Sequence, residues 1–303
     1  MATIECVNLN KDYENTKAIT DLSFTIEENT ITGLIGRNGA GKTTLLKIIK
    51  GFIKPTSGDI KVFGTNPFDC LSVSANSFFT DDNMEFPSTF NLSKLLEETS
   101  KFYPNWDSSL AKGLFDYFGL NPKQYHGNLS KGQNSTFNMI VALSSHSALT
   151  IFDEPTSGMD ASVRKDFYRA LLKDYLQYPR TIIVSSHMLS ELEGILENIL
   201  LIKNGTKVLH LPVDELKEMA IGLKGDISSI NTFIENKAII HSEKNNGNQL
   251  LVVVKNDFSK AALEKAKLSG IEILPVSIED LCVYLTAKSE RGIDDVFDRT
   301  KRI

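Results

Sequence analysis

The sequence has few of the residues that build disulfide frameworks or structural metal sites. Only three of its 303 residues are cysteines, and Cys6, Cys70 and Cys282 lie far apart in the chain. Their spacing matches neither a disulfide framework nor a zinc site. We therefore expect reduced, buried thiols in a cytosolic protein.

Long hydrophobic runs are also missing. No apolar stretch approaches the roughly 18–20 residues that a membrane-spanning helix needs. The chain starts with Met-Ala-Thr-Ile-Glu-Cys, which lacks the basic and then apolar segments of a signal peptide. Any role at a membrane is therefore expected to come through a partner protein.

Positive charge is not in excess either. The 33 Lys and Arg residues against 38 Asp and Glu residues leave a net charge of −5, which argues against a general nucleic-acid binder, so we expect no nucleic-acid partner. The hydrophobic content of 41% is enough for a good core, in one large domain plus a small one or in two domains of similar size.

The first feature that is present is a phosphate-binding pattern. Residues 36–44 read GRNGAGKTT and fit G-x-x-x-x-G-K-[ST], with a buried strand expected before this loop and a helix after it. Glycines let several backbone N–H groups face one phosphate, and the helix adds its positive end. Lys42 supplies a charge for the β- and γ-phosphates, and Thr43 a hydroxyl ligand for Mg²⁺. We therefore predict that the chain binds a nucleoside triphosphate. The predicted nucleotide-binding residues of the loop are Gly36, Arg37, Asn38, Gly39, Ala40, Gly41, Lys42, Thr43 and Thr44.

Two adjacent carboxylates follow the apolar segment 150–152. Asp153 and Glu154 come at the carboxyl end of an expected buried strand, where an α/β sheet presents its ligand-contacting loops. Asp153 is expected to hold Mg²⁺, mainly through water, and Glu154 to polarise the attacking water. His187 follows the next expected buried strand, and we expect it to contact the γ-phosphate or Glu154. Glu154 and His187 are the predicted catalytic residues.

A second anion site is expected at the start of another helix, in the segment 129–133, which reads LSKGQ. Ser130 and the backbone N–H of Gly132 lie at that helix start. One chain does not need two phosphate sites for one nucleotide, unless the second site serves the nucleotide of a partner. We therefore predict two cassettes that face each other, with ATP between the P-loop of one and this helix start of the other.

Strands alternate with helices through most of the chain, which predicts an α/β fold whose parallel sheet is covered on both faces. The strands are expected at 30–35, 59–63, 150–152 and 181–185. Helices are expected at about 91–102, 129–143 and 160–177, and a further helix is expected to start at residue 107. A hairpin with the turn Asn204-Gly205 is expected to close this part near residue 211. After a boundary at 222–225, a small α+β domain is expected, with strands at 238–241, 250–254 and 271–274 and helices at 259–269 and 278–285.

Taken together, these motifs make the sequence resemble the ATPase subunit of an ATP-binding cassette (ABC) transporter, from residue 1 to about 211. Residues 36–44 match the Walker A motif, 129–133 the signature usually written LSGGQ, and 150–154 the end of Walker B. Residues 157–160 look like the D-loop, which ends in Asp160, and His187 looks like the switch histidine. The signature residues that the resemblance places against the partner's nucleotide are Ser130, Lys131, Gly132 and Gln133.

Tyr13 matches the aromatic A-loop position of the family, where it would stack on the adenine ring. From the sequence alone, a tyrosine in the core is an equally good interpretation.

The resemblance implies a P-loop NTPase core with an inserted helical subdomain, followed by the small α+β domain. The corresponding ranges are 1–212 for the cassette, about 88–146 for the helical subdomain, 225–288 for the accessory domain and 289–303 for a charged tail. Residues 102–106 and 275–281 are similar to exporter ATPases of Gram-positive bacteria that carry such a C-terminal domain. The implied function is ATP hydrolysis, with ATP and Mg²⁺, that drives export through a separate transmembrane permease. The implied partners also include a second ABC ATPase subunit, identical or different, and the implied location is cytoplasmic, on the inner face of the cell membrane.

The sequence departs from the family pattern at two positions. Lys131 replaces the usual first glycine of the signature, which is tolerable because Ser130 and Gly132 remain. The family also places a glutamine in the Q-loop, whereas this chain has none between Lys42 and Gln124. By position Asp81 is the substitute. Either it ligates Mg²⁺ and alters coupling, or it is solvated and the contact is missing.

Two other functions compete with export. A soluble ABC ATPase acting on nucleic acid or ribosomes typically has two cassettes in one chain or a long coiled coil, and this acidic chain has neither. A low-turnover ATP-sensing regulator is disfavoured by Glu154 and His187, while Asp81 keeps that alternative open.

Overall fold

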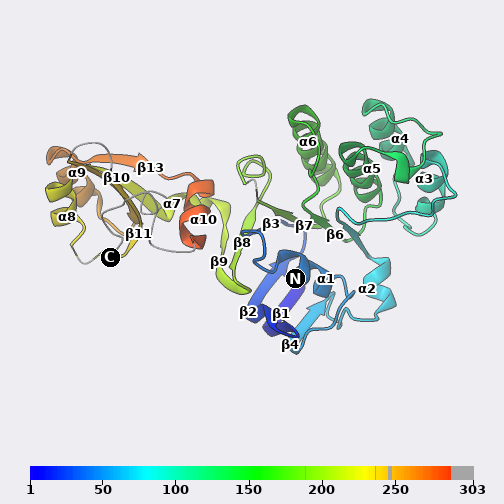
Figure 1. Cartoon of the computed structure of the whole chain (residues 1–303), viewed down its shortest axis with the longest axis horizontal. Helices are drawn as coiled ribbons and strands as arrows, with labels where there is room; N and C mark the ends of the chain where they lie inside the picture. Colours follow the sequence, from blue (N-terminus) through cyan, green and yellow to red (C-terminus); the bar gives the residue numbers. More distant parts are fainter. Residues whose placement is uncertain (188, 236, 245–247, 288–303) are drawn as a thin grey trace. The chain divides into compact units, whose positions relative to one another are not determined.

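The computed structural model describes residues 1–187, 189–235, 237–244 and 248–287 (Figure 1). The chain divides into two compact units, Met1–Val213 and Asp214–Ile303. The predicted charged tail, 289–303, lies outside the described residues.

A six-stranded sheet forms the centre of the first unit. Its strands follow one another in the order β5 (Ser77–Thr80), β6 (Leu149–Asp153), β7 (Thr181–Ser186), β3 (Ile31–Ile35), β8 (Asn198–Lys203) and β9 (Thr206–Pro212). The first five strands pair in parallel, and β9 returns antiparallel to β8 through the predicted turn at Asn204 and Gly205. β3, β6 and β7 are buried along their whole length, because both faces of a parallel sheet are covered. The predicted α/β fold is confirmed.

A second, antiparallel sheet packs over the first helix. Its strands are ordered β2 (Thr16–Glu27), β1 (Ala2–Tyr13) and β4 (Ser57–Val62). Helix α1 (Lys42–Ile49) lies between the two sheets, with Leu45 and Ile48 fully buried in a core that both sheets share. Burial on two sides holds α1, and therefore the loop that precedes it, in a fixed position.

Three helices lie close together in the region that was expected to be helical (Figure 1). They are α3 (Leu92–Ser100), α4 (Ser108–Tyr117) and α5 (Lys131–Ser144), preceded by the short 3₁₀ helix η1 (His126–Asn128). Asn91 caps α3, and the predicted cap Asp107 accepts a hydrogen bond from the backbone N–H of Leu110 at the start of α4. The longest helix of the unit, α6 (Ala161–Gln177), begins after Asp160.

The segment 66–90 contains more regular structure than its composition indicates. It includes helix α2 (Leu71–Ala75) as well as β5. Elements of five and four residues are too short to show a periodicity in the sequence, and β5 is established by its pairing with β6.

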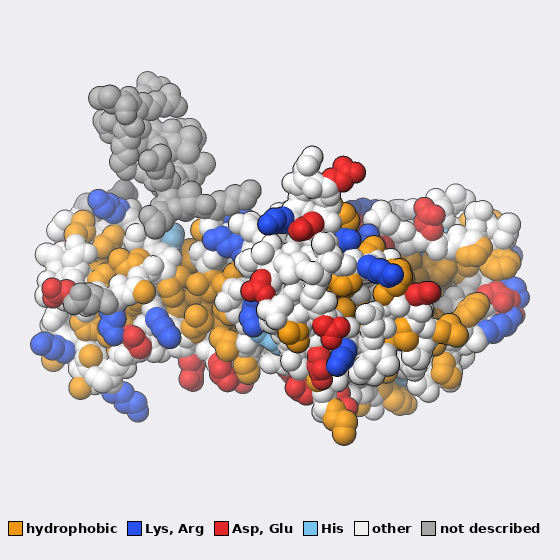
Figure 2. Space-filling view, turned by 90° about the horizontal axis from the view of Figure 1, so that it is seen from below, with side chains coloured by type: hydrophobic (Ala, Val, Ile, Leu, Met, Phe, Trp, Pro, Cys, Tyr) orange, Lys and Arg blue, Asp and Glu red, His pale blue; other side chains and the backbone are white. Residues whose placement is uncertain are grey.

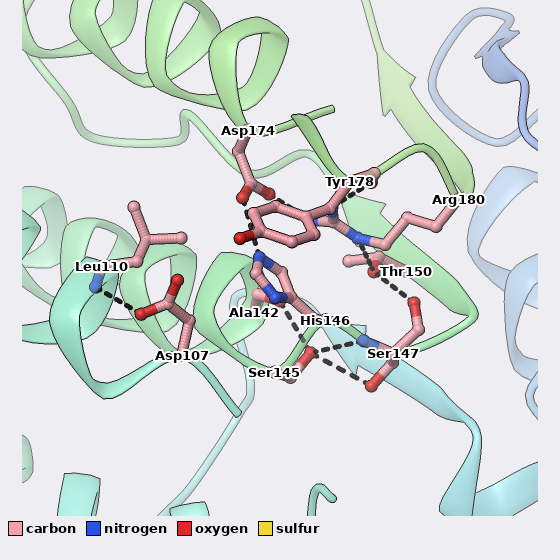
Figure 3. A network of polar contacts seen from close by, with 10 residues as sticks. All are labelled: Asp107, Leu110, Ala142, Ser145, His146, Ser147, Thr150, Asp174, Tyr178 and Arg180. Atoms are coloured by element: carbon pink, nitrogen blue, oxygen red, sulfur yellow. Dashed lines mark hydrogen bonds and ion pairs between the residues drawn. The ribbon is translucent and has the colours of Figure 1, made fainter. Parts of the chain in front are cut away.

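A buried polar network joins the amino ends of β6 and β7 to the ends of two helices (Figure 3). Asp174 of α6 accepts hydrogen bonds from His146 Nε2 (2.8 Å) and Arg180 (2.6 Å). Arg180 also donates to the hydroxyl of Thr150 (3.3 Å), and the rings of His146 and Tyr178 lie 4.5 Å apart. These contacts pair the buried charges of Asp174 and Arg180, so we interpret the network as a structural feature that stabilises the fold of the first unit.

The second unit is a small α+β unit, as predicted. Its antiparallel sheet is ordered β11 (Ile239–Lys244), β12 (Gln249–Lys255), β10 (Ala220–Asp226) and β13 (Glu272–Pro275). Its helices are α7 (Val213–Glu218), which begins at the unit boundary, α8 (Ile227–Phe233), α9 (Lys260–Leu268) and α10 (Ile278–Thr286).

The segment 222–225, interpreted above as a boundary, lies inside β10. Its glycines mark a close contact between strands, because a Cβ on Gly222 would lie 3.3 Å from Leu274 Cβ. β10 pairs with β12 on one side and β13 on the other, which places these glycines in the middle of the sheet.

His126 provides a test of the packing around α5. Its ring is buried against Phe86 and Phe137, and Nε2 lies 3.1 Å from Asn138 Oδ1. Burial lowers the pKa of His126 from its usual 6.5, and the hydrogen bond to Asn138 opposes this shift. The unfolded chain therefore takes up this proton at a higher pH than the folded chain, so the free energy of unfolding falls as the pH drops below 6.5.

We expect His126→Gln to be less stable than the wild type near neutral pH, since ring packing is lost. The difference in unfolding free energy should narrow as the pH falls from about 7.5 to about 5.5, because the variant has no proton to take up. Urea unfolding at both pH values measures this difference. A constant difference would mean that His126 titrates alike in the folded and unfolded chains.

Candidate functional site

The loop between β3 and α1 forms a narrow backbone turn. Gly39 and Gly41 have φ angles of 81° and 103°, a region that side chains rarely adopt. A Cβ on Gly41 would lie 2.5 Å from the carbonyl oxygen of Ala18, so no larger residue fits there. The N–H of Ala40 donates to the carbonyl of Arg37 (3.0 Å), which closes the turn. Gly36, at the start of the loop, is buried, whereas Arg37, Asn38 and Gly39 are exposed.

Lys42, at the start of α1, points back over this loop. Its Nζ donates to the carbonyl of Gly36 (2.8 Å) and lies 3.3 Å from Glu154 Oε1. Only 7% of the Lys42 side chain is exposed, whereas Thr43 is exposed and Thr44 is half-buried in the same turn of the helix. The ammonium group is therefore aimed into the loop, and the hydroxyl of Thr43 is accessible beside it.

Asp153 and Glu154 are held at the carboxyl end of β6 by a residue of the neighbouring strand. The hydroxyl of Ser185 in β7 donates to Asp153 Oδ1 (2.5 Å) and accepts from the backbone N–H of Glu154 (2.9 Å). Glu154 has a φ angle of 51°, which is uncommon for a residue with a side chain and common at functional sites. Ser185 is not among the site residues predicted from the sequence, because its only signal there is its place at a strand end near His187.

The Glu154 carboxylate lies between two cationic or hydrogen-bonding partners. Its Oε2 is 2.7 Å from His187 Nδ1, and its Oε1 faces Lys42. Because a carboxylate can only accept, the Nδ1–H group of His187 is the donor in this contact. His187 is 62% exposed. The carboxyl ends of the neighbouring strands β3, β6 and β7 thus bring Lys42, Glu154 and His187 together.

The LSKGQ residues lie at the start of α5 and contact the segment 157–160. Ser130 caps the helix by accepting from the backbone N–H of Gln133, whose side chain in turn accepts from the N–H of Ser130. A Cβ on Gly132 would lie 2.5 Å from the carbonyl oxygen of Gly158, so the helix start and this turn are in direct contact. Asp160 is occupied in capping α6, through the N–H of Val163 (2.9 Å).

Asp81 follows β5 and is half-buried. Its Oδ1 accepts from the backbone N–H of Asn83 (3.0 Å), and it lines a small cavity together with Glu154. The neighbouring Asp82 forms an ion pair with Lys131 (3.0 Å). The acid at the Q-loop position therefore lines the same cavity as Glu154.

Tyr13 lies at the end of β1, in the turn that leads to β2. Its side chain is 44% exposed, and the Nζ of Lys11 lies 4.9 Å from the ring centre. The exposed ring is therefore outside the core.

Comparison with known sequences identifies relatives of this chain. The family described as ABC transporter matches residues 19–157. The ABC transporter ATP-binding protein YtrB of Bacillus subtilis (strain 168) is 26% identical over 282 residues, which cover 92% of this chain and 97% of that protein. The bacitracin transport ATP-binding protein BcrA of Bacillus licheniformis is 31% identical over 220 residues, which cover 71% of each. The SkfA peptide export ATP-binding protein SkfE of Bacillus subtilis is 27% identical over 225 residues, covering 73% of this chain and 93% of that protein.

Solved structures share the fold. The ATP-binding subunit of an ABC transporter superposes with a TM-score of 0.64 at 21% identity, over 71% of this chain and 92% of that chain. A bacterial ABC transporter cassette whose structure is described as dimeric superposes with a TM-score of 0.60 at 20% identity, over 69% of this chain and 98% of that chain. The chain therefore belongs to the ABC transporter family, as an ATP-binding subunit with ATPase activity.

Proposed function

We propose that this chain is the ATPase subunit of an ABC exporter and that it drives a separate transmembrane permease by ATP-dependent pairing of two cassettes. The observation that carries this proposal is the line of contacts from Lys42 through Glu154 to His187 at the carboxyl edge of the sheet. It provides a phosphate-binding cation, a base and a group that orients the base within one site.

The P-loop holds the phosphates of ATP in this proposal. Lys42 leaves Glu154 and binds the β- and γ-phosphates, while the loop N–H groups and the start of α1 complete the anion site. Separation from Lys42 leaves the Glu154 carboxylate free to face a water molecule. The exposed ring of Tyr13 is proposed to stack on the adenine.

The residues at the loop fit a Mg²⁺ ion. Thr43 offers an exposed hydroxyl and Asp153 a carboxylate, and hard oxygen donors of this kind, with phosphate oxygens and water, are what Mg²⁺ prefers. When bound, Mg²⁺ neutralises charge that develops on the phosphates. Asp81 lies within reach of the same region, and we retain it as a further oxygen donor. In the part of the chain that the structure describes, no group of three or more His, Cys, Asp and Glu side chains is placed to hold a metal ion.

Glu154 is the proposed general base. Its Oε2 is held by His187, and its backbone N–H is held by Ser185, so the carboxylate is oriented before the reaction. The base takes a proton from the attacking water while the water oxygen bonds to the γ-phosphorus. The bond between that phosphorus and the β-phosphate oxygen breaks, so ADP and inorganic phosphate are the products. His187 keeps the carboxylate in position.

The start of α5 is the proposed contact with the nucleotide of a second cassette. Ser130 and Gly132 place a hydroxyl and an N–H group at a helix N-terminus, the arrangement that binds phosphate oxygens. Gln133 and Lys131 flank them, and Asp160 belongs to the neighbouring turn. The second cassette is proposed to be a copy of this chain or a related chain.

The proposal that the chain serves an exporter is based on its relatives. The bacitracin transport protein and the SkfA peptide export protein are similar to this chain across most of its length. Among the described helices, none is long and apolar enough to cross a membrane. The proposed location, in the cytoplasm at the inner face of the cell membrane, follows from the proposed permease, which would be the anchor of the chain.

The proposed division of the chain is a cassette at 1–212, with the helical subdomain at about 88–146, followed by an accessory domain. This domain was expected at 225–288 but begins earlier, because β10 (Ala220–Asp226) belongs to its sheet. The helices α3, α4 and α5 support the subdomain, and the separate sheet of the second unit supports the accessory domain.

We expect Glu154→Gln to lower the turnover of ATP by about 10²-fold or more, the usual contribution of a general base. Binding of ATP should be retained, because Gln keeps the shape of the side chain and Lys42 remains. Steady-state phosphate release and equilibrium binding of a fluorescent ATP analogue measure the two properties. Glu264→Gln, the same change at an exposed glutamate of the second unit, serves as the matched control and should turn over normally. Wild-type turnover in Glu154→Gln would remove Glu154 from the catalytic role.

We expect His187→Gln to reduce kcat by a smaller factor than Glu154→Gln, because His187 acts by orienting the carboxylate. The double variant should be no slower than Glu154→Gln alone, since residues that act as a unit are not additive. Single-turnover measurements on the four proteins give the comparison. Additive losses would show that His187 contributes independently of Glu154.

Co-purification tests the partner. Tagged Glu154→Gln, added to native membranes and solubilised in detergent with ATP and Mg²⁺, should bring down a multi-spanning permease, with or without a second ATPase. Recovery of ribosomal or nucleoid proteins without a membrane protein would instead support the soluble ABC ATPase. Within the part of each unit that Figure 2 shows, Lys and Arg side chains are interspersed with Asp and Glu side chains, a charge distribution that we judge better suited to a protein partner than to nucleic acid.

A further inference from the structure

Lys131, one of the two departures from the family pattern, contacts the segment that contains the other. It stands at the glycine position of the signature, and Asp81 stands at the Q-loop position. The Nζ of Lys131 is 3.0 Å from Oδ2 of Asp82, the residue after Asp81. The positive charge at the start of α5 is therefore paired with a negative charge after β5.

The stem of Lys131 contacts a third motif. A Cβ on Gly158 would lie 2.7 Å from Lys131 Cγ and 3.0 Å from its Cβ, so the aliphatic part of the lysine lies directly against the turn 157–160. This contact directs the side chain away from that turn and toward Asp82. One side chain thus connects the signature, the D-loop and the segment after β5.

The ion pair is exposed enough to exchange its partner. The side chains of Lys131 and Asp82 are 61% and 40% exposed. Ion pairs of this kind contribute little to stability, so a stronger counter-ion can replace Asp82 at small cost. A terminal phosphate carries more negative charge than one carboxylate and is such a counter-ion.

We propose that the Lys131–Asp82 ion pair is a nucleotide-sensitive latch, which the γ-phosphate of ATP bound to the opposite cassette opens by taking Lys131 as its counter-ion. This inference rests on the proposed pairing of two cassettes across the start of α5. Lys131 then favours ATP over ADP, because ADP has no γ-phosphate to offer. Release of Asp82 frees the segment after β5 at the same step, which connects recognition of the second nucleotide to that segment.

The test measures cassette pairing as a function of ATP concentration. All variants of the full chain are made in the Glu154→Gln background, so that ATP is not consumed, and dimer formation is followed by analytical ultracentrifugation with Mg²⁺. Asp82→Asn removes the competitor of the γ-phosphate and should lower the half-maximal ATP concentration by about two- to fivefold, the range that an exposed ion pair supports. Lys131→Met removes the counter-ion and should raise it by a similar or larger factor. ADP should give no difference among these proteins.

The opposite directions are the critical result. If the ion pair were merely structural, Asp82→Asn and Lys131→Met would shift the half-maximal ATP concentration in the same direction. The latch requires Asp82→Asn to lower this concentration and Lys131→Met to raise it. In the double variant the effect of Asp82→Asn should vanish, so that it matches Lys131→Met. Lys131→Arg keeps the charge, so its half-maximal ATP concentration should stay within about twofold of that of the Glu154→Gln parent. Lys123→Met, which removes an exposed lysine shortly before α5, is the matched control and should leave pairing unchanged.

The outcomes separate the latch from the function on which it rests. If the Glu154→Gln parent does not pair with ATP, the proposed two-cassette arrangement is overturned, and the latch with it. If the parent pairs but the two single variants shift together, or neither shifts, the latch alone is overturned.

Discussion

The hydroxyl of Ser185 makes the contact on which the geometry of the site depends. It joins the ends of two parallel strands, because it donates to the Asp153 carboxylate and accepts from the backbone N–H of Glu154. Glu154 adopts a positive φ, and the bond to its N–H helps to hold that conformation. This link fixes the Asp153 carboxylate and the Glu154 backbone, while the Glu154 carboxylate is held by its own contacts with Lys42 and His187.

Burial of α1 between two sheets provides the second constraint. A helix packed on both sides cannot shift without disturbing two cores, so the loop before it keeps its narrow turn. The loop is also held from outside, since Ala18 of β2 leaves no space for a Cβ on Gly41, and the N–H of Gly205 donates to the carbonyl of Ala40. The antiparallel strands thus support the phosphate-binding loop as well as covering α1.

The two ends of the parallel strands have different tasks. At their amino ends, Asp174 and Arg180 are buried and fully paired, which suits a stable framework. At their carboxyl ends, the Glu154 carboxylate contacts both Lys42 and His187, and these groups can exchange partners when a phosphate binds. Lys131 and Asp82 extend the same property to the surface, where an exposed pair costs little to open.

The family, the fold class and the residues of the phosphate loop could all be predicted from the amino-acid sequence. These signals are local: residues 36–44 form one continuous motif, and the alternation of strands and helices is visible without knowledge of contacts. Short or glycine-containing elements were missed, because β5 exists only by pairing with β6, and β10 shows glycines where neighbouring strands approach closely. The contacts of Ser185 with Asp153 and Glu154, and of Lys131 with Asp82, are visible only in the folded chain. Such contacts join segments that are far apart in the sequence, and a serine or an aspartate gives no sign of its distant partner until folding brings the two together.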